Sequence, residues 1–230
     1  MKLFLQFTLI LLGTVSTPTA FAQKTIIDLY ELYKGRNHLE PANREKSYAD
    51  VAGSPYAQQD FIIGSVVLKN GDTYEAVPLR YNAYEDQIEF KHPNGVVLNL
   101  NNPNKLKLVT IGQQQYTYFE KAETPPDGLT GYFELLENGE IQLLKRQNII
   151  LEKAAPAKAY QDPKPAHFKE RPTDYYIHYQ NQLFKVNSKK QFFTTFPSLE
   201  KDLKPFIKKQ KLKFRQEEDL RRIINQANQL

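Results

Sequence analysis

The residues best suited to chemistry form one polar cluster between two β-like segments. Two neighbouring carboxylates beside an arginine offer fixed oxygens and a fork of donors, which can hold a cation or orient a polar ligand. The sequence favours a simpler interpretation, a β-turn with a salt bridge, because adjacent carboxylates are common in loops. The candidate ligand-binding residues are Arg80, Tyr81, Asn82, Tyr84, Glu85 and Asp86.

Catalysis is the alternative use of these carboxylates. Glu85, Asp86 or Glu89 could act as acid or base in a hydrolase of polysaccharide or peptide, with a second carboxylate about 5 to 10 Å away. The common motifs for nucleophilic serine, zinc, phosphate and dinucleotide sites are missing. The histidines stand far apart in the sequence, so we predict no metal and no cofactor, and we assign no catalytic residue. They are His38, His92, His167 and His178.

A second set of candidates is the basic run near the C-terminus. Residues 184–215 hold ten lysine and arginine residues against Glu200 and Asp202, an excess of +8. Lysine stems can cover apolar surface while their ammonium groups stay in water. We expect either a solvated face that keeps the protein soluble, which the sequence favours, or weak attraction to an anionic envelope surface. The candidates are Lys201, Lys204, Lys208, Lys209, Lys211 and Lys213.

The N-terminus has the three parts of a secretory signal. Lys2 precedes an apolar run, residues 3–12, and small residues lead to Ala20 and Ala22. The run is roughly half the length that a transmembrane helix needs. We therefore predict cleavage between Ala22 and Gln23 and a periplasmic or extracellular protein without a membrane span, away from nucleic acid. Because the chain has no cysteine, neither disulfides nor a lipid anchor on cysteine is expected.

Turn signals divide the remaining chain into four parts. We predict an arm over 23–46, a β-rich body over 47–152, a linker or long loop over 153–173, and a hairpin with a helical tail over 174–230. Six apolar residues between 26 and 33 suit either a short helix or an extended arm. The linker is predicted because this stretch is rich in alanine and lysine and has four prolines, each of which lacks a backbone N–H donor. One domain with a tail is preferred to two domains divided near residue 125.

Strand pairs dominate the body. Asn70-Gly71 and Asn138-Gly139 separate β-branched or aromatic runs, and Asn-Gly accepts the positive φ of a hairpin turn. Alternating tyrosines in strands indicate core packing more often than an exposed platform for sugar rings or bases. The pattern predicts a mainly β fold with α: a hairpin-rich antiparallel sandwich or open barrel. The predicted hairpins span 65–77, 87–100, 106–119, 132–145 and 175–186.

Beyond residue 188 the apolar period changes to three or four. Leu199, Leu203 and Ile207 share one helix face, and Leu220 with Ile224 share another. Residues 211–214 are the expected connection. The sequence thus predicts a C-terminal tail of two amphipathic helices.

Several short strings resemble a group of uncharacterised exported β-rich proteins of Gram-negative bacteria. The resemblance implies an envelope or secreted location and brings no activity or catalytic residue with it. We expect a non-catalytic envelope protein that binds a protein partner or an anionic surface, or has a structural role. The strings are Gly53-Ser54-Pro55-Tyr56, Phe61, Gly64, Pro78-Leu79-Arg80-Tyr81-Asn82, Ile88-Glu89-Phe90, Tyr175-Tyr176-Ile177 and Lys189-Lys190.

Overall fold

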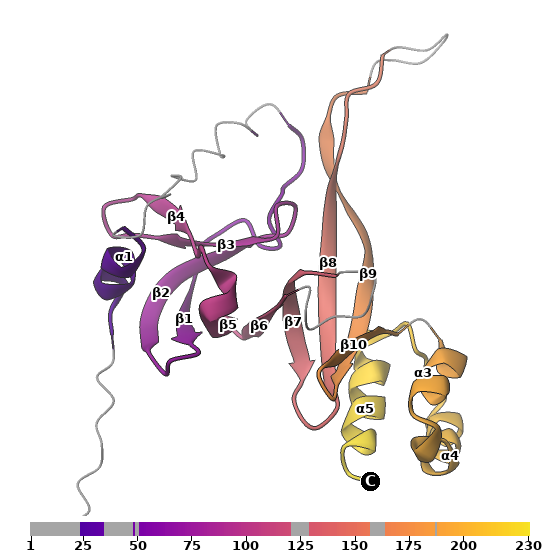
Figure 1. The fold of residues 1–230 in the computed structure, drawn as a ribbon. Coiled ribbons are helices and arrows are strands. Elements are labelled where there is room, and N and C mark those ends of the chain that lie inside the picture. Colours follow the sequence, from indigo (N-terminus) through magenta and orange to yellow (C-terminus); the bar gives the residue numbers. More distant parts are fainter. Residues whose placement is uncertain (1–23, 35–47, 49–50, 121–128, 157–163, 187) are drawn as a thin grey trace, which may run out of the picture.

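The computed structural model describes residues 24–34, 48, 51–120, 129–156, 164–186 and 188–230 (Figure 1). Its strands are β1 (Ile62–Leu68), β2 (Thr73–Asn82), β3 (Gln87–Lys91), β4 (Val97–Asn99), β5 (Leu106–Ile111), β6 (Gln114–Phe119), β7 (Gly131–Glu137), β8 (Gln142–Glu152), β9 (His167–Tyr179) and β10 (Gln182–Lys185). The helices are α1 (Ile26–Lys34), α3 (Lys189–Thr195), α4 (Glu200–Gln210) and α5 (Glu217–Ala227), with short 3-10 turns η1 (Pro103–Lys105) and η3 (Pro197–Leu199).

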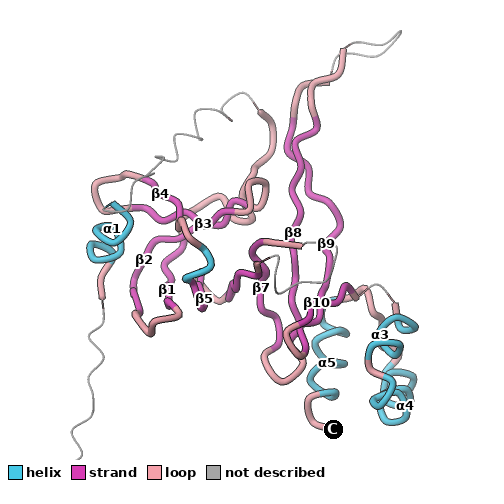
Figure 2. The backbone as a smooth tube through the Cα atoms, in the orientation of Figure 1, coloured by secondary structure: helices cyan, strands magenta, loops and turns pink. Residues whose placement is uncertain are grey.

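All ten strands belong to one antiparallel open sheet (Figure 2). Their order is β10-β9-β8-β7-β6-β5-β1-β2-β3-β4, so most neighbours in space are also neighbours in sequence. The predicted mainly β fold with a helical C-terminal tail is confirmed. A single sheet accommodates every predicted hairpin, because each Asn-Gly or similar turn returns the chain beside the strand it has just left.

The turn between β1 and β2 shows how the hairpins close. Gly71 has φ +94°, a conformation that glycine adopts without steric cost. Asn70 Oδ1 accepts a hydrogen bond from the backbone N–H of Asp72 at 3.1 Å. Gly64, within β1, lies so close to Thr110 that an added Cβ would stand 1.8 Å from its carbonyl oxygen. That close approach accompanies the register shift beside Gly64.

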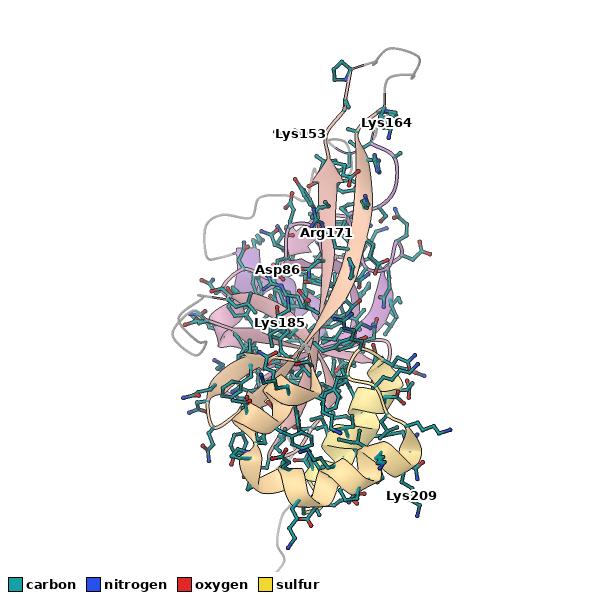
Figure 3. All side chains as sticks on the ribbon, turned by 90° about the vertical axis from the view of Figure 1, so that its right-hand side faces the viewer. Asp86, Lys153, Lys164, Arg171, Lys185 and Lys209 are labelled. Atoms are coloured by element: carbon teal, nitrogen blue, oxygen red, sulfur yellow. The ribbon has the colours of Figure 1, made fainter. Side chains whose placement is uncertain are left out.

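The predicted linker over 153–173 is wrong at its C-terminal end. Residues 167–173 open β9, which pairs with β8 from Glu152↔His167 to Asn148↔Arg171. Pro172 falls where the register shifts, a position at which its missing N–H removes no regular ladder bond. The two strands continue beyond the rest of the sheet as a projecting ribbon, with Lys153 and Lys164 toward its end (Figure 3).

The N-terminal half packs around its own apolar core. The apolar segment for which the sequence left helix and arm open forms α1, and Leu29 and Tyr33 on its inner face are buried. Thr25 N–H and its hydroxyl both donate to Asp28, which closes the first turn. Ile149 of β8 and Phe168 of β9 belong to the same core as β1–β6. The sheet therefore curves until its middle strands meet the N-terminal hairpins.

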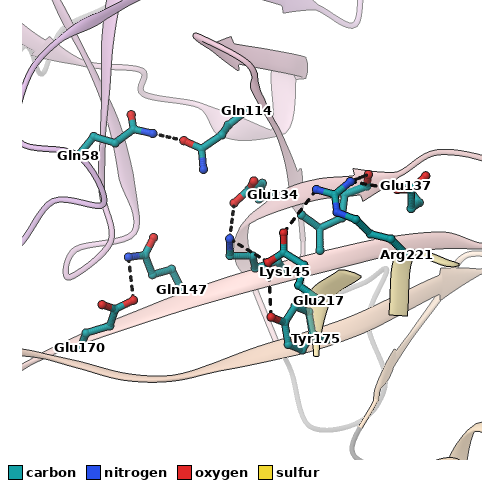
Figure 4. A network of polar contacts seen from close by, with 11 residues as sticks. Gln58, Gln114, Glu134, Glu137, Lys145, Gln147, Glu170, Tyr175, Glu217 and Arg221 are labelled. Carbon is teal, nitrogen blue, oxygen red and sulfur yellow. Dashed lines mark hydrogen bonds and ion pairs between the residues drawn. The ribbon is translucent and has the colours of Figure 1, made fainter. Parts of the chain in front are cut away.

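The C-terminal half is covered by helices. The two predicted tail helices are confirmed as α4 and α5, and α3 is an additional helix capped by the Ser188 side chain. Leu203, Ile207 and Leu220 pack with α3 and the strands in a second core. Ion pairs surround this contact: Lys145 lies 3.3 Å from Glu134 and 3.2 Å from Glu217 (Figure 4). The tail is thus docked on the sheet.

Candidate functional site

Strand alternation divides the predicted polar cluster between two faces. Arg80, Tyr81 and Asn82 lie inside β2 and are buried, whereas the sequence placed them in a loop. Arg80 pairs across the sheet with Glu89, at 2.7 Å between Nη2 and Oε2. Its guanidinium stacks 3.6 Å from the ring centroid of Tyr56. The salt bridge expected for Arg80 therefore joins two strands and stabilises the fold, and its partner is neither Glu85 nor Asp86.

Asp86 occupies the other face and joins distant strands. Its Oδ1 accepts hydrogen bonds from the Tyr81 hydroxyl at 2.8 Å and the Tyr132 backbone N–H at 3.1 Å. Its Oδ2 lies 3.3 Å from Nη2 of Arg146 on β8. Three strands separate β2 from β7 in the sheet. Asp86 thus fastens the β2–β3 turn onto the middle of the curved sheet.

Burial is the largest influence on the Asp86 carboxyl and raises its pKa above the ordinary value. Arg146, the Tyr132 N–H and the Tyr81 hydroxyl oppose that rise because they stabilise the charged form. The fit depends on Gly131, where a Cβ would stand 1.9 Å from Asp86 Oδ2. Burial also raises the pKa of the Tyr132 hydroxyl well above its usual range. The phenol therefore stays protonated at neutral pH and can donate a hydrogen bond.

The other two residues of the turn have different neighbours. Tyr84 is partly exposed, and its ring packs edge-on to Phe168 with centroids 5.2 Å apart. Glu85 accepts a hydrogen bond from the Tyr48 hydroxyl, and its backbone N–H donates to Asn82 Oδ1 at 3.0 Å. Of the six predicted residues, Glu85 and Asp86 line a cavity.

That cavity has a volume of about 320 Å³. Two of its lining residues, Asn99 and Tyr132, are only 7% and 3% exposed. Asn99 Oδ1 and the Tyr132 hydroxyl are buried from solvent and have no hydrogen-bond partner among the described residues. An unsatisfied buried polar group is costly to the fold. The lining residues are Glu85, Asp86, Gln87, Asn99, Leu100, Asn101, Asn102, Pro103, Tyr118 and Tyr132.

Sequence reasoning missed Asn99, Tyr118 and Tyr132. The asparagine-rich segment 99–104 is a visible signal, since four asparagines around one proline indicate a polar turn. The tyrosines sit in ordinary alternating strands, and nothing local separates them from core tyrosines. Only the curvature of the sheet brings β6 and β7 beneath the β2–β3 turn.

The cavity lining favours recognition of an uncharged polar ligand. Oxygen and amide groups dominate it, and among the described residues that line it none is lysine, arginine or histidine. Among the described residues, no group of three or more histidine, aspartate or glutamate side chains is placed to hold a metal ion. Glu89, one of the possible acids of a hydrolase, is 1% exposed and bound to Arg80.

The basic candidates form a separate surface. All six lysines predicted for anion attraction are exposed, on α4 or just beyond it. Among the described residues only Lys204 of the six has an ion pair, with Glu200. Lys204 also borders a shallow groove of about 500 Å³ between α3 and α4. The groove is lined by Lys189, Lys190, Phe193, Thr194, Glu200 and Lys204.

Comparison with known proteins gives no match to a family model, a curated protein or a solved structure. The predicted signal and its cleavage site lie outside the described residues. In the part of the chain that the structure describes, no helix has the length and apolar character to cross a membrane. The cavity and the basic surface are therefore the observations on which function has to be argued.

Proposed function

We propose that this chain is an exported, non-catalytic binding protein of the bacterial cell envelope, and that it holds a small uncharged polar ligand in the cavity beneath the β2–β3 turn. The export part of the proposal is supported by the signal-like residues 1–22. Intact-mass measurement of the exported protein tests it. The expected mass is that of a chain that begins at Gln23. The mass of a chain that still includes Met1 would contradict the proposal.

One observation supports the binding part: the cavity is lined by the polar side chains of Glu85, Asp86 and Asn99 and by the aromatic side chains of Tyr118 and Tyr132. Small-molecule sites combine apolar or aromatic walls with a few convergent polar groups in this way. The volume of the cavity lies at the small end of the range for ligand pockets.

Binding is favoured over hydrolysis by the state of the carboxylates. Glu89 is sealed in its ion pair with Arg80. Asp86 already accepts from Tyr81 and Tyr132 and pairs with Arg146, so its oxygens have little freedom to attack or to transfer a proton. The raised pKa of Asp86 is the feature that favours the hydrolase alternative. Turnover of a chromogenic glycoside or peptide that is lost in Asp86→Asn would establish that alternative.

The binding proposal is tested with simple probes. Acetamide, glycylglycine, N-acetylglucosamine and putrescine are added separately to ¹⁵N-labelled protein, and the Asn99 side-chain amide signal is followed by NMR. At least one probe should shift that signal in the wild type. The Tyr118→Ala variant should lose the shift, because it removes a half-buried aromatic side chain from the lining of the cavity.

Tyr116→Phe is the matched control. Tyr116 is a buried strand tyrosine that does not line the cavity, so its variant should respond to the probes as the wild type does. If no probe shifts the Asn99 signal in the wild type, the cavity is not a binding site and the proposal fails. A shift that persists unchanged in Tyr118→Ala has the same consequence.

A second proposed role is attachment to an anionic envelope surface. It is supported by the exposure of the six lysines on and beyond α4 and by the groove where three lysines surround a single carboxylate, Glu200. Exposed ammonium groups attract anionic headgroups weakly and over roughly one Debye length. This role uses the helical end of the molecule, where Lys209 lies away from Asp86 of the cavity (Figure 3), so the two can be tested separately.

A further inference from the structure

We propose that the groove between α3 and α4 binds the phosphate monoester headgroup of an envelope lipid. The inference rests on the proposed attachment to an anionic surface and names the group that this surface recognises. It depends on three features of the described residues: two lysines beside one aromatic ring, a surplus of positive charge in the groove, and a stripe of lysines along α4. Two of the groove lysines, Lys189 and Lys190, are not among the six that the sequence singled out.

The ring of Phe193 brings lysines from both helices together. Its centroid lies 6.0 Å from Lys189 Nζ on α3 and 5.8 Å from Lys204 Nζ on α4. The two ammonium groups are therefore no farther apart than the sum of these distances, and both lysines are exposed to solvent. Like charges at short range repel each other, and an anion that binds between them replaces this repulsion with attraction.

The base of the groove is held in place by the helical core. Phe193 is 6% exposed and packs edge-on against Phe192, with centroids 5.3 Å apart. Leu203, which precedes Lys204 in the sequence, is fully buried in the same core. The backbone from which the lysines extend is thus fixed before an anion binds. Binding has to order only the lysine side chains, which lowers its entropic cost.

The charge of the described lining suits a dianion. Lys189, Lys190 and Lys204 are its cations, and Glu200 is its carboxylate. Glu200 is ion-paired with Lys204, whereas Lys189 and Lys190 make no ion pair among the described residues. A phosphate monoester carries a charge of about −1.5 to −2 at neutral pH, more than a phosphodiester or a carboxylate. Lysine binds phosphate as a point charge, without the planar geometry that arginine requires.

The lysines beside the groove favour a phosphate carried by a lipid over a free one. Lys201, Lys204 and Lys208 are three and four residues apart on α4, so they lie along one side of the helix. All three are exposed. A stripe of exposed lysines attracts an anionic membrane surface, to which each lysine contributes weakly. A free phosphate ester would gain little from the stripe outside the groove. We infer that the stripe attracts the membrane and that the groove selects the headgroup.

Vesicle co-sedimentation tests the headgroup preference. Phosphatidylcholine vesicles contain either phosphatidic acid, a phosphate monoester, or phosphatidylglycerol, a phosphodiester, in amounts that give equal surface charge. We expect the wild type to bind the phosphatidic acid vesicles about fivefold more tightly. The groove variant, Lys189→Gln with Lys190→Gln, should bind both kinds alike. The matched control, Lys208→Gln with Lys209→Gln, removes the same charge outside the groove. It should bind both kinds more weakly and keep the preference.

The other outcomes separate this inference from the attachment role. If the wild type binds phosphatidylglycerol vesicles as tightly as phosphatidic acid vesicles, or more tightly, the inference is overturned while attachment stands. A preference that persists in the groove variant, or that is lost in the control, has the same result. If the wild type sediments with neither kind of vesicle at low salt, both proposals are overturned.

Calorimetric titration with glycerol 3-phosphate identifies the source of the phosphate. We expect this soluble monoester to bind the wild type more weakly than the phosphatidic acid vesicles do, because it lacks the surface that the lysine stripe attracts. Binding of glycerol 3-phosphate that is as tight as that of the vesicles, and that is lost in the groove variant, would identify a soluble phosphate ester as the occupant. That result would overturn the lipid assignment.

Discussion

The two halves of this sheet are buried in different ways. On β2 and β3 the covered polar positions hold Arg80, Asn82 and Glu89, which pack beneath residues 51–61. Around α5 the covered positions hold Leu220, Ile223 and other apolar side chains. Apolar contacts are satisfied by any close neighbour, whereas buried polar groups need specific partners. Among the described residues, the polar half accordingly holds the unpaired buried atoms of Asn82, Asn99 and Tyr132, whereas the helical half holds Arg221 Nε.

The contrast extends to how each half is held in register. In the polar half a single carboxylate, Asp86, joins β2, β7 and β8. In the apolar half the charged contacts lie at the rim, as with Arg221, whose Nη1 donates to the Leu136 carbonyl at 2.6 Å. Removing one residue should hence have consequences of a different kind in each half. Four predictions test this difference, beginning with the largest effect.

Arg80→Ala should lower the free energy of unfolding by about 3 to 5 kcal/mol, because it leaves the Glu89 carboxylate buried without its cation. Urea denaturation measures the loss. The double variant Arg80→Met with Glu89→Leu should recover most of it, since replacing both charges removes the desolvation penalty. A loss below about 1 kcal/mol in Arg80→Ala would show that the pair contributes little and that the halves do not differ.

Leu220→Ala should cost about 2 to 5 kcal/mol, the usual range for a cavity in a packed core. Leu220 is fully buried between α5 and the strands. Because the change leaves no buried charge without a partner, the folded fraction should bind the probes as the wild type does. Urea denaturation and the NMR probe assay measure the two effects. Arg222→Ala, an exposed change on the same helix, should stay within about 0.5 kcal/mol; an equal loss would mean that α5 is not docked through its apolar face.

Local patterns located most elements of the apolar half. Turn pairs such as Asn138-Gly139 located the hairpins, and apolar spacing located α4 and α5, because both depend on neighbours within a few residues. The helix α3 escaped notice because its short span of seven residues presents only Phe192 and Phe193 inward. The first part of β9, residues 167–173, was assigned to the linker because of Pro172, which the strand accommodates at a register shift.

The arrangement of the polar half could not be predicted from local sequence patterns. Arg80 looked like a loop residue because an arginine in a buried strand is rare, and its burial depends on residues 51–61 folding over it. Three of the residues that line the cavity, Asn99, Tyr118 and Tyr132, belong to three different strands. Their convergence follows from the curvature of the sheet and the Asp86 bridge, which are tertiary properties. Alternation could have paired Arg80 with Glu89, but it could not have located the cavity.

The Asp86 bridge gives a third, smaller effect, in the pH dependence of stability. Its raised pKa means that the folded state holds a proton more readily than the unfolded state, whose carboxyl titrates near 3.8. Stability from this group is accordingly full below 3.8 and falls as pH rises through the higher folded pKa. The unfolding free energy of the wild type, relative to Asp86→Asn, should decrease as pH rises across that interval.

Urea titrations of the two proteins at a series of acidic and neutral pH values measure this difference. The unfolding free energy of the variant is subtracted from that of the wild type at each pH. This removes the contributions of other titrating groups, such as Asp72, whose pKa is lowered by Lys24 and whose contribution to stability has the opposite pH dependence. A difference that instead grew as pH rose would mean that Arg146 outweighs burial at Asp86. The bridge would then be an ordinary stabilising ion pair, and the polar half would resemble the rim contacts of the apolar half.

The smallest effect on stability is expected at the outer face of the helical half. Changing Lys208, Lys209, Lys211 and Lys213 to glutamine should alter the unfolding free energy by no more than about 0.5 kcal/mol per site, because all four are exposed and make no ion pair among the described residues. The same change should abolish binding to vesicles with anionic headgroups. Co-sedimentation at low and moderate salt measures the binding.

The salt dependence decides what the lysines do. Attraction between exposed charges is screened over about 8 to 10 Å at moderate ionic strength, so wild-type binding should fall steeply as salt rises. A matched control changes Lys69, Lys91, Lys105 and Lys107, exposed in the N-terminal half, to glutamine and should bind as the wild type does. If the wild type does not sediment with anionic vesicles even at low salt, the lysines only keep the helical half soluble. The polar cavity would then be the remaining binding surface proposed for the molecule.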